Sequence, residues 1–295
     1  MIYERISSNK RSSILLIALF FALIISLGYL FGALFAYGYI GIFIAFIISI
    51  SMILFSYYNG DKAVLSINRA VPASKKEYPY LINTVEGLSI AAGISNPKVY
   101  VIDDPAINAF ATGRDPKHAS VAVTTGALHK LDREELEGVI GHELSHVKNY
   151  DIRFMTLVAI LVGVVAMLSN FMLRSFWWGG GSRDREKGGE LQIILILVGI
   201  AMAIFAPLIA QFIKFAISRR REFLADADGA LLTRYPKGLA DALRKIEKDQ
   251  NELKHASPAM EHMYISNPFK KKNWFVNMFS THPPIEERIK ALEAM

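Results

Sequence analysis

Residues 132–146 read DREELEGVIGHELSH, and this stretch decides the fold of the 295-residue chain. Asp132 is a favourable helix N-cap, and Glu135, three residues on, completes a capping-box pattern. Apolar residues recur beyond the cap at helical spacing, at Leu136, Val139 and Ile140. The segment therefore predicts a well-capped helix with one face packed against a core.

The last turns of this helix carry two histidines. His142 and His146 lie four residues apart, on one helix face, from which both imidazoles can reach one cation at about 2.0–2.1 Å. Glu143 lies one residue round from His142, where it can take a proton from a water that attacks a peptide carbonyl. The pattern indicates a zinc-dependent protease with Glu143 as the catalytic base. A solvated pair of helical histidines is the alternative.

A catalytic zinc needs a third protein ligand and an open position. The residue six positions after His146 is Ile152, and the region about twenty residues on, near Ala166, is apolar. Glu222 and Asp226 share a helical face beyond the last apolar segment. We therefore predict Glu222 as the third ligand and Asp226 as a hydrogen-bond acceptor for a ligating imidazole. The alternative for Glu222 is an ordinary solvated charge beside three arginines. The chain has no cysteine, so thiolate ligands are excluded.

Long apolar segments indicate a membrane protein, with 52% apolar residues and a mean hydropathy of +0.29. Residues 12–60, 154–173 and 191–213 contain no charged residue. A span needs about 20 apolar residues, so the first segment allows two crossings and the others one each. The first run continues directly into a second span, which favours retained anchors over a cleaved signal peptide. The alternative for the later pair is buried or re-entrant packing without a full crossing.

The net charge of +6 comes from basic residues that flank the apolar segments. Lys10 and Arg11 precede the first span, and Lys62 follows the second, whereas the turn at Tyr37 and Gly38 is uncharged. The positive-inside rule therefore predicts a multi-pass protein of the cell membrane with its catalytic part in the cytoplasm. Lipid headgroups explain the basic residues better than nucleic acid does, so no nucleic-acid partner is expected.

The apolar segments divide the chain into four expected parts. These are a transmembrane hairpin (1–57), a first catalytic part (58–153), a second hydrophobic hairpin (154–213) and a second catalytic part with the third zinc ligand (214–295). Alternating β-branched stretches predict three strands, at 98–103, 108–113 and 119–124. The expected fold is mainly α with a small β-sheet and about four transmembrane helices.

Three further residues are candidates for substrate or transition-state binding. The strand from Asn108 to Gly113 is predicted either as an exposed edge that pairs with an extended substrate or as a plain core strand. His282 precedes two prolines, and it either faces the oxyanion of the tetrahedral intermediate or anchors the C-terminal helix. Arg288 is a candidate for orienting Asp226 or substrate.

The ordered set of motifs resembles the HtpX-type membrane zinc metalloproteases, which are relatives of the CAAX prenyl endopeptidase. The resemblance covers nearly the whole chain and rests on NAFATG (108–113), GHELSH (141–146), REFLAD (221–226), THPP (281–284) and Glu287-Arg288. It implies one zinc per chain held by His142, His146 and Glu222, with Glu143 as base and proton shuttle. It also implies a gluzincin fold, a substrate backbone held by the Asn108 amide, and a task in stress response and quality control of membrane proteins.

Two other functions remain open on the sequence. A processing peptidase with one lipidated partner would need a larger intramembrane chamber than four spans supply. A channel or transporter would usually carry ionisable residues inside its spans, and these spans contain none. The expected partners are therefore protein substrates, chiefly membrane proteins, and the lipid bilayer. The sequence leaves the oligomeric state undetermined.

Overall fold

The computed structural model describes residues 2–34, 39–161, 163–164, 219–268 and 282–295. Residues 154–161 are helical. The rest of the predicted second hairpin, from residue 165 to residue 213, lies outside the described residues, as does Thr281 of the THPP motif.

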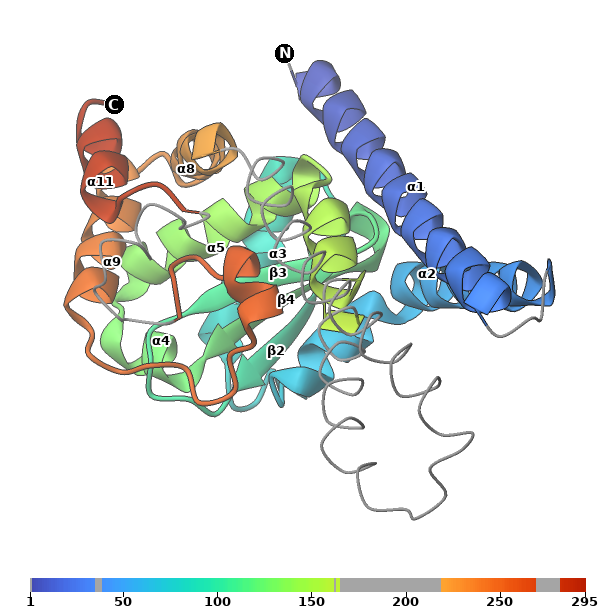
Figure 1. Ribbon diagram of the computed structural model, residues 1–295. Helices are drawn as coiled ribbons and strands as arrows, with labels where there is room; N and C mark the ends of the chain where they lie inside the picture. The colour runs from blue at the N-terminus through green and yellow to red at the C-terminus, as the bar shows by residue number, and fades with distance from the viewer. Residues whose placement is uncertain (1, 35–38, 162, 165–218, 269–281) are drawn as a thin grey trace.

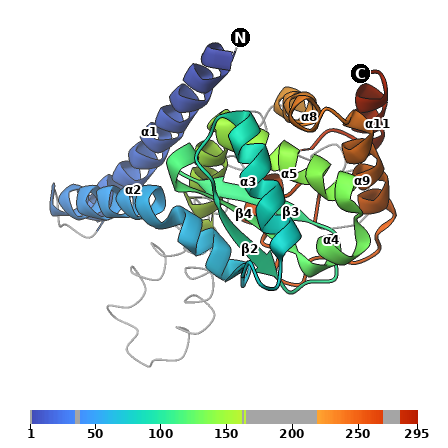
Figure 2. The same ribbon diagram turned by 180° about the vertical axis from the view of Figure 1, so that it is seen from behind.

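The first two helices form a hairpin that projects from the rest of the chain (Figures 1 and 2). Helix α1 spans Ile2–Leu34 and helix α2 spans Tyr39–Ile67. Their segments Ile6–Ser26 and Ile42–Ile67 are long and apolar enough to cross a membrane, and only 22% and 17% of the residues in an 18-residue apolar window of each are buried within the protein. Large apolar side chains on the outside of the hairpin fit a lipid environment better than water.

A small mixed sheet follows the hairpin, with strand order β1-β2-β4-β3. Strand β2 (Lys98–Ile102) pairs in parallel with β4 (Ala119–Thr124), and β3 (Ala109–Gly113) pairs antiparallel with β4. These three strands match the predicted ones to within a residue. The two-residue strand β1 (Val71–Pro72) was not predicted, because it is too short to show an alternating pattern.

The other described elements are short helices arranged around the sheet. Helix α3 ends at Gly93, which adopts the left-handed conformation at φ 69°. The bounds are α3 Pro79–Ala92, η1 Pro116–His118, α4 Thr125–Lys130, α5 Arg133–Lys148, α8 Arg219–Thr233, α9 Pro236–Lys248, η3 Pro258–Met263 and α11 Ile285–Glu293. The described chain is thus mostly helical with a small mixed sheet.

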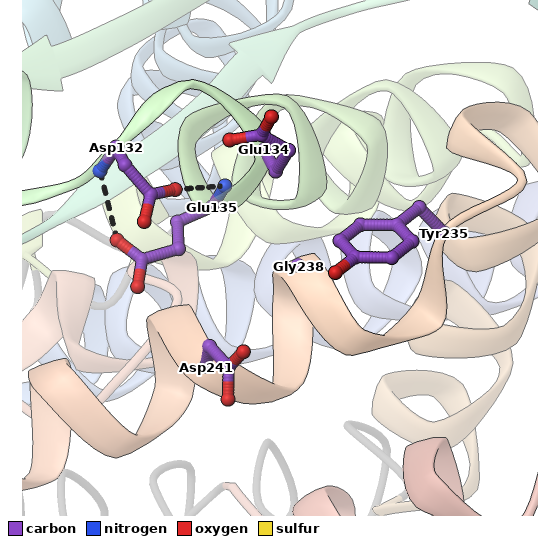
Figure 3. Close-up of a pocket in the computed structure, with 6 residues that line it drawn as sticks. All are labelled: Asp132, Glu134, Glu135, Tyr235, Gly238 and Asp241. Carbon is purple, nitrogen blue, oxygen red and sulfur yellow. Dashed lines mark hydrogen bonds between the residues drawn. The ribbon is translucent and has the colours of Figure 1, made fainter.

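Helix α5 is the centre of the core. Its capping box is confirmed: the Glu135 N–H donates to Asp132 Oδ1 at 3.0 Å, and the Asp132 N–H donates to Glu135 Oε2 at 2.8 Å. Figure 3 shows both bonds beside a surface pocket lined mainly by carboxylates. Beyond the cap, apolar residues of α5 pack with those of α3, β4 and α9 in one buried cluster. Residues from the first and the last turn of α5 lie in this cluster, so core packing holds both ends of the helix in place.

Two glycines let α8 approach α5 closely. A Cβ atom on Gly229 of α8 would lie 2.8 Å from the His142 backbone nitrogen, and one on Gly141 of α5 would lie 3.1 Å from the Gly229 carbonyl oxygen. Any larger residue at position 229 must therefore push the two backbones apart. The approach of α8 to the histidines of α5 depends on this absence of side chains.

We predict that Gly229→Ala destabilises the protein by about 1–3 kcal/mol, the usual cost of overpacking a well-packed core. Gly87→Ala in α3 is the matched control, because a Cβ atom there meets nothing within 4 Å. That control should be neutral or gain about 0.4–1 kcal/mol through the reduced entropy of the unfolded chain. Thermal unfolding of both variants in detergent checks this, and equal stability of the two would contradict it.

Candidate metal centre and active site

Three buried side chains meet where α8 crosses α5. The ligand atoms of His142, His146 and Glu222 all lie within 4.8 Å of one another. The two Nε2 atoms are 3.2 Å apart. Glu222 Oε2 lies 3.8 Å from His142 Nε2, and Glu222 Oε1 lies 3.6 Å from His146 Nε2. Ligands at about 2.0–2.2 Å from one tetrahedral cation would be separated by similar distances.

The outer nitrogen of each imidazole contacts a carboxylate. His142 Nδ1 lies 2.8 Å from Asp226 Oδ1, and His146 Nδ1 lies 3.0 Å from Asp151 Oδ2. Because a carboxylate accepts hydrogen bonds, each Nδ1 carries the proton and each Nε2 presents its lone pair inwards. Two buried lone pairs at 3.2 Å repel unless a cation lies between them. The donor set therefore fits a metal ion.

The surroundings of Glu222 and His146 shift the pKa values of these two side chains in opposite directions. Burial opposes the charge on Glu222, but His282, His146 and Arg288 outweigh it and hold the pKa of Glu222 well below its usual range. Burial also opposes the charge on His146, but Asp151 and Glu222 outweigh it and raise the pKa of His146 to about 9. Glu222 is thus an anion, and the position of His146 favours positive charge, as expected where a cation binds.

Glu143 lies beside this centre, but its neighbours do not outweigh the effect of burial on its pKa. Its side chain is 1% exposed, and its Oε1 atom has no hydrogen-bond partner in the described part of the chain. Burial raises the pKa of Glu143 to about 7, although the neighbouring His146 and a hydrogen bond from the Ala111 backbone partly oppose the shift. An unpartnered buried carboxylate oxygen is costly, which makes Glu143 a candidate for a chemical task.

Arg288 of α11 lies fully buried behind the ligands. Its Nε and Nη2 atoms donate to both oxygens of Asp226 at 2.8 and 2.7 Å, and Nη1 donates to the Ile265 carbonyl at 2.9 Å. Nη1 also lies 3.7 Å from Glu222 Oε2. Of the two tasks considered for Arg288, the structure places it for orienting Asp226. Arg288 lowers the pKa of Asp226 to about 2 against the effect of burial.

His282 is also placed behind a ligand. Its Nδ1 atom lies 3.2 Å from Glu222 Oε2, and its Nε2 atom lies 3.2 Å from the Glu261 carbonyl. The side chain is buried, with both ring nitrogens engaged by protein atoms. This geometry is closer to the anchoring alternative than to a group that faces a reacting carbonyl.

Asn108 precedes the last strand of the sheet. Within the described residues no further strand lies beside β3, but all five residues of β3 are buried and the Ile265 N–H donates to the Ala109 carbonyl at 3.0 Å. The edge is therefore not exposed as the first alternative expected. The Asn108 Nδ2 atom lies 3.5 Å from the Ser266 carbonyl, a weak hydrogen bond at most.

Sequence reasoning missed Asp151, the carboxylate beside His146. The sequence does contain one indication of this role, because Asp151 is an acidic residue that lies three positions beyond the end of α5. Asp151 follows Tyr150, which adopts a positive φ of 62°. That conformation is uncommon for a residue other than glycine, and a propensity scale would not predict it.

Two histidines four residues apart on a helix, with a glutamate directly after the first, form the H-E-x-x-H pattern of the zincin class of metallopeptidases. Comparison with protein families agrees, because residues 75–295 match peptidase family M48. The chain belongs to this family. It is therefore a metalloprotease, a hydrolase of peptide bonds, as the motifs predicted.

Curated relatives match over the full length. A protein named Protease HtpX homolog from Caldanaerobacter subterraneus is 48% identical over 295 residues, covering 100% of this chain and 98% of the relative. Homologues of the same name from Dictyoglomus thermophilum and Listeria monocytogenes are 46% and 42% identical, with coverage of 99% and 100% of this chain and 94% and 100% of the relatives. The predicted resemblance to HtpX-type proteases is confirmed.

A solved structure, that of Ste24p from S. mikatae, aligns with 99% of this chain and 67% of its own length. The identity is 18% and the TM-score is 0.49.

We predict that Glu222→Gln, which keeps the shape of the side chain, strongly weakens metal binding. The substitution removes the charge that offsets the cation, and losing a coordinating group acts on affinity before chemistry. Glu143→Gln is the matched control, because it removes a carboxylate of equal burial that is not among the three ligand atoms. Metal content of the purified variants should fall in the first and stay near the parent value in the second. Retention of metal by Glu222→Gln would contradict the assignment.

Proposed function

We propose that this chain is a zinc-dependent endopeptidase that cuts misfolded or damaged membrane proteins at the cytoplasmic face of the cell membrane. The observation that carries the proposal is the meeting of His142, His146 and Glu222 beside a buried carboxylate with an unpartnered oxygen. The ligand set supports zinc, since two imidazoles and one carboxylate leave a tetrahedral ion one open position. With Glu222 as the third ligand, the catalytic part is a gluzincin and holds one zinc per chain.

A zinc ion held by His142, His146 and Glu222 would supply Lewis acidity, which would polarise a peptide carbonyl and lower the pKa of water towards about 7. Glu143 then takes the proton of the attacking water with its unpartnered oxygen and delivers it to the leaving amine. Burial raises the pKa of Glu143, which favours a carboxyl group that can both gain and lose a proton during the reaction. Asp226 and Asp151 keep the two imidazoles turned inwards, and Arg288 fixes Asp226.

Substrate binding is proposed along β3, where an extended peptide must displace the segment at Tyr264 and Ile265 that now covers the edge of the strand. The Ala111 backbone contacts Glu143, so this strand runs beside the catalytic base. An extended peptide that binds here would compete with the Ser266 carbonyl for the Asn108 amide, whose present bond of 3.5 Å is weak. Main-chain pairing demands little of the substrate sequence, which suits a protease that clears varied proteins. We assign His282 to holding Glu222 in place.

The membrane hairpin supports the choice of substrate class. Its two apolar helices are continuous with the catalytic part, since α2 runs on to Ile67 and β1 begins at Val71. A site tethered this closely to the bilayer meets membrane proteins at a high local concentration. Basic residues on both flanks of the hairpin support a cytoplasmic site in a multi-pass protein.

The central experiment compares casein cleavage by the detergent-purified parent and by Glu143→Gln. The variant should bind about one zinc per chain but lose at least about a hundredfold in rate, because general-base catalysis contributes about 10²–10⁴-fold. Glu137→Gln, on the partly exposed face of α5 where Glu137 accepts a hydrogen bond from Tyr80, should cleave at the parent rate. Equal cleavage by the parent and Glu143→Gln would refute the mechanism.

Topology can be tested with single cysteines, because the native chain has none. A cysteine at Gly38, in the predicted outer turn, should react with an impermeant maleimide on intact cells. A cysteine at Gly87, where α3 has open space, should react only after the membrane is permeabilised. The reverse labelling pattern would place the catalytic part outside the cell.

A further inference from the structure

A buried polar side chain on the first membrane helix reaches the surroundings of the metal centre. Asn9 of α1 is 5% exposed and lies directly before Lys10 and Arg11, at the N-terminal end of the candidate span Ile6–Ser26. Its Nδ2 atom donates to the Asn149 carbonyl at 2.8 Å and to Asp151 Oδ1 at 2.6 Å. Both partners are acceptors, so the amide must present its two N–H groups to them. The side chain thus uses its full donor capacity on the end of α5.

The two oxygens of Asp151 are divided between the membrane helix and the metal centre. Oδ1 accepts from Asn9, and Oδ2 contacts His146 Nδ1 at 3.0 Å. Arg221 Nη1 lies farther from Oδ1, at 3.6 Å. A carboxylate held at one oxygen can still rotate, whereas one held at both oxygens has a fixed plane. Asn9 therefore sets the orientation in which Asp151 meets His146.

Asn9 also fixes the turn that carries Asp151. Its two partners lie on either side of Tyr150, whose positive φ of 62° is unfavourable for a residue with a side chain. The Lys10 ammonium of the same helix lies 4.6 Å from the centre of the Tyr150 ring. Two consecutive residues of α1 thus hold a strained turn that aims Asp151 back at the last turn of α5.

From these contacts we infer that Asn9 is a positioning residue for the metal centre, acting through Asp151 on His146. The inference rests on the proposed function, because it assumes that His146 binds a metal. The packing of α1 against the end of α5 would then contribute to the geometry of the metal site. The catalytic part has its full metal affinity only when α1 is docked on the turn at Tyr150.

The test measures zinc affinity by competition with a chelator for the full-length protein in detergent. Asn9→Leu matches the size of the native side chain, removes both donors and is well tolerated in a membrane helix; Asn9→Ala is the second variant. Each should weaken zinc binding about tenfold, the lower end of the cost of losing a group that supports a ligand. Ser13→Ala is the matched control, because Ser13 is equally buried on the same face of α1 but bonds only the Asn9 carbonyl.

A double-mutant cycle at Asp151 separates positioning from general packing. The partner variant is Asp151→Ala rather than Asp151→Asn, because an asparagine would keep an oxygen that accepts from Asn9. Asp151→Ala alone should weaken zinc binding about 10–100-fold, and adding Asn9→Leu should then cost little more. An equal loss from Asn9→Leu with and without Asp151, an equal loss from Ser13→Ala, or parent affinity in both Asn9 variants would overturn the inference. A parent that binds no zinc would overturn the proposed function and this inference with it.

Discussion

The structure depends on one electrostatic constraint: two imidazole lone pairs and a carboxylate are held within a few ångströms of each other, out of water. His142 and His146 are fixed by their spacing on α5, so the remaining freedom lies in how Glu222 reaches them. That requirement explains the two facing glycines, since α8 can bring Glu222 to the histidines only where neither backbone carries a side chain. The capping box at the start of α5 serves the same requirement. It stabilises the helix whose regular spacing keeps both histidines on one face.

Burying so many charges is expensive, and the C-terminal helix offsets the cost. An ion moved into a protein interior loses hydration at a cost of about several kcal/mol, and pairing and hydrogen bonds must offset this cost. Arg288, at 0% exposure, pairs with both oxygens of Asp226 and lies near Glu222. Removing Arg288 would leave two carboxylates without this neighbour. Helix α11 is therefore part of the site, although it contributes no ligand and lies far from α5 in the sequence.

The sequence predicted the local features of this arrangement and missed most of the long-range ones. The capping box, the strands and the helical face shared by His142 and His146 follow from periodicity and spacing, which are local properties. The closeness of Glu222 to the pair was predicted only through ligand chemistry and family resemblance, because no local pattern shows which distant carboxylate arrives. Asp151 and Asn9 were missed since their contact depends on the docking of α1 and on an unusual backbone angle at Tyr150. A plain core strand was one of the two alternatives for β3, but its contact with Ile265 was not predicted, because it joins residues far apart in the sequence.

The proposed roles of Glu222 as a metal ligand and of Glu143 as a base agree with the different surroundings of the two side chains. Glu143 and Glu222 are the same residue type, equally buried and beside the same two histidines. Glu222 lies among His282, His146 and Arg288, so its pKa falls well below the usual range, and it stays an anion that can bind a cation. Glu143 keeps one oxygen without a partner, so burial dominates and its pKa rises to about 7. Neighbouring carboxylates with opposite shifts are how an active site divides acid–base chemistry from charge stabilisation. If the surroundings of Glu143 and Glu222 were exchanged, with no change in either side chain, the directions of their pKa shifts would be exchanged as well.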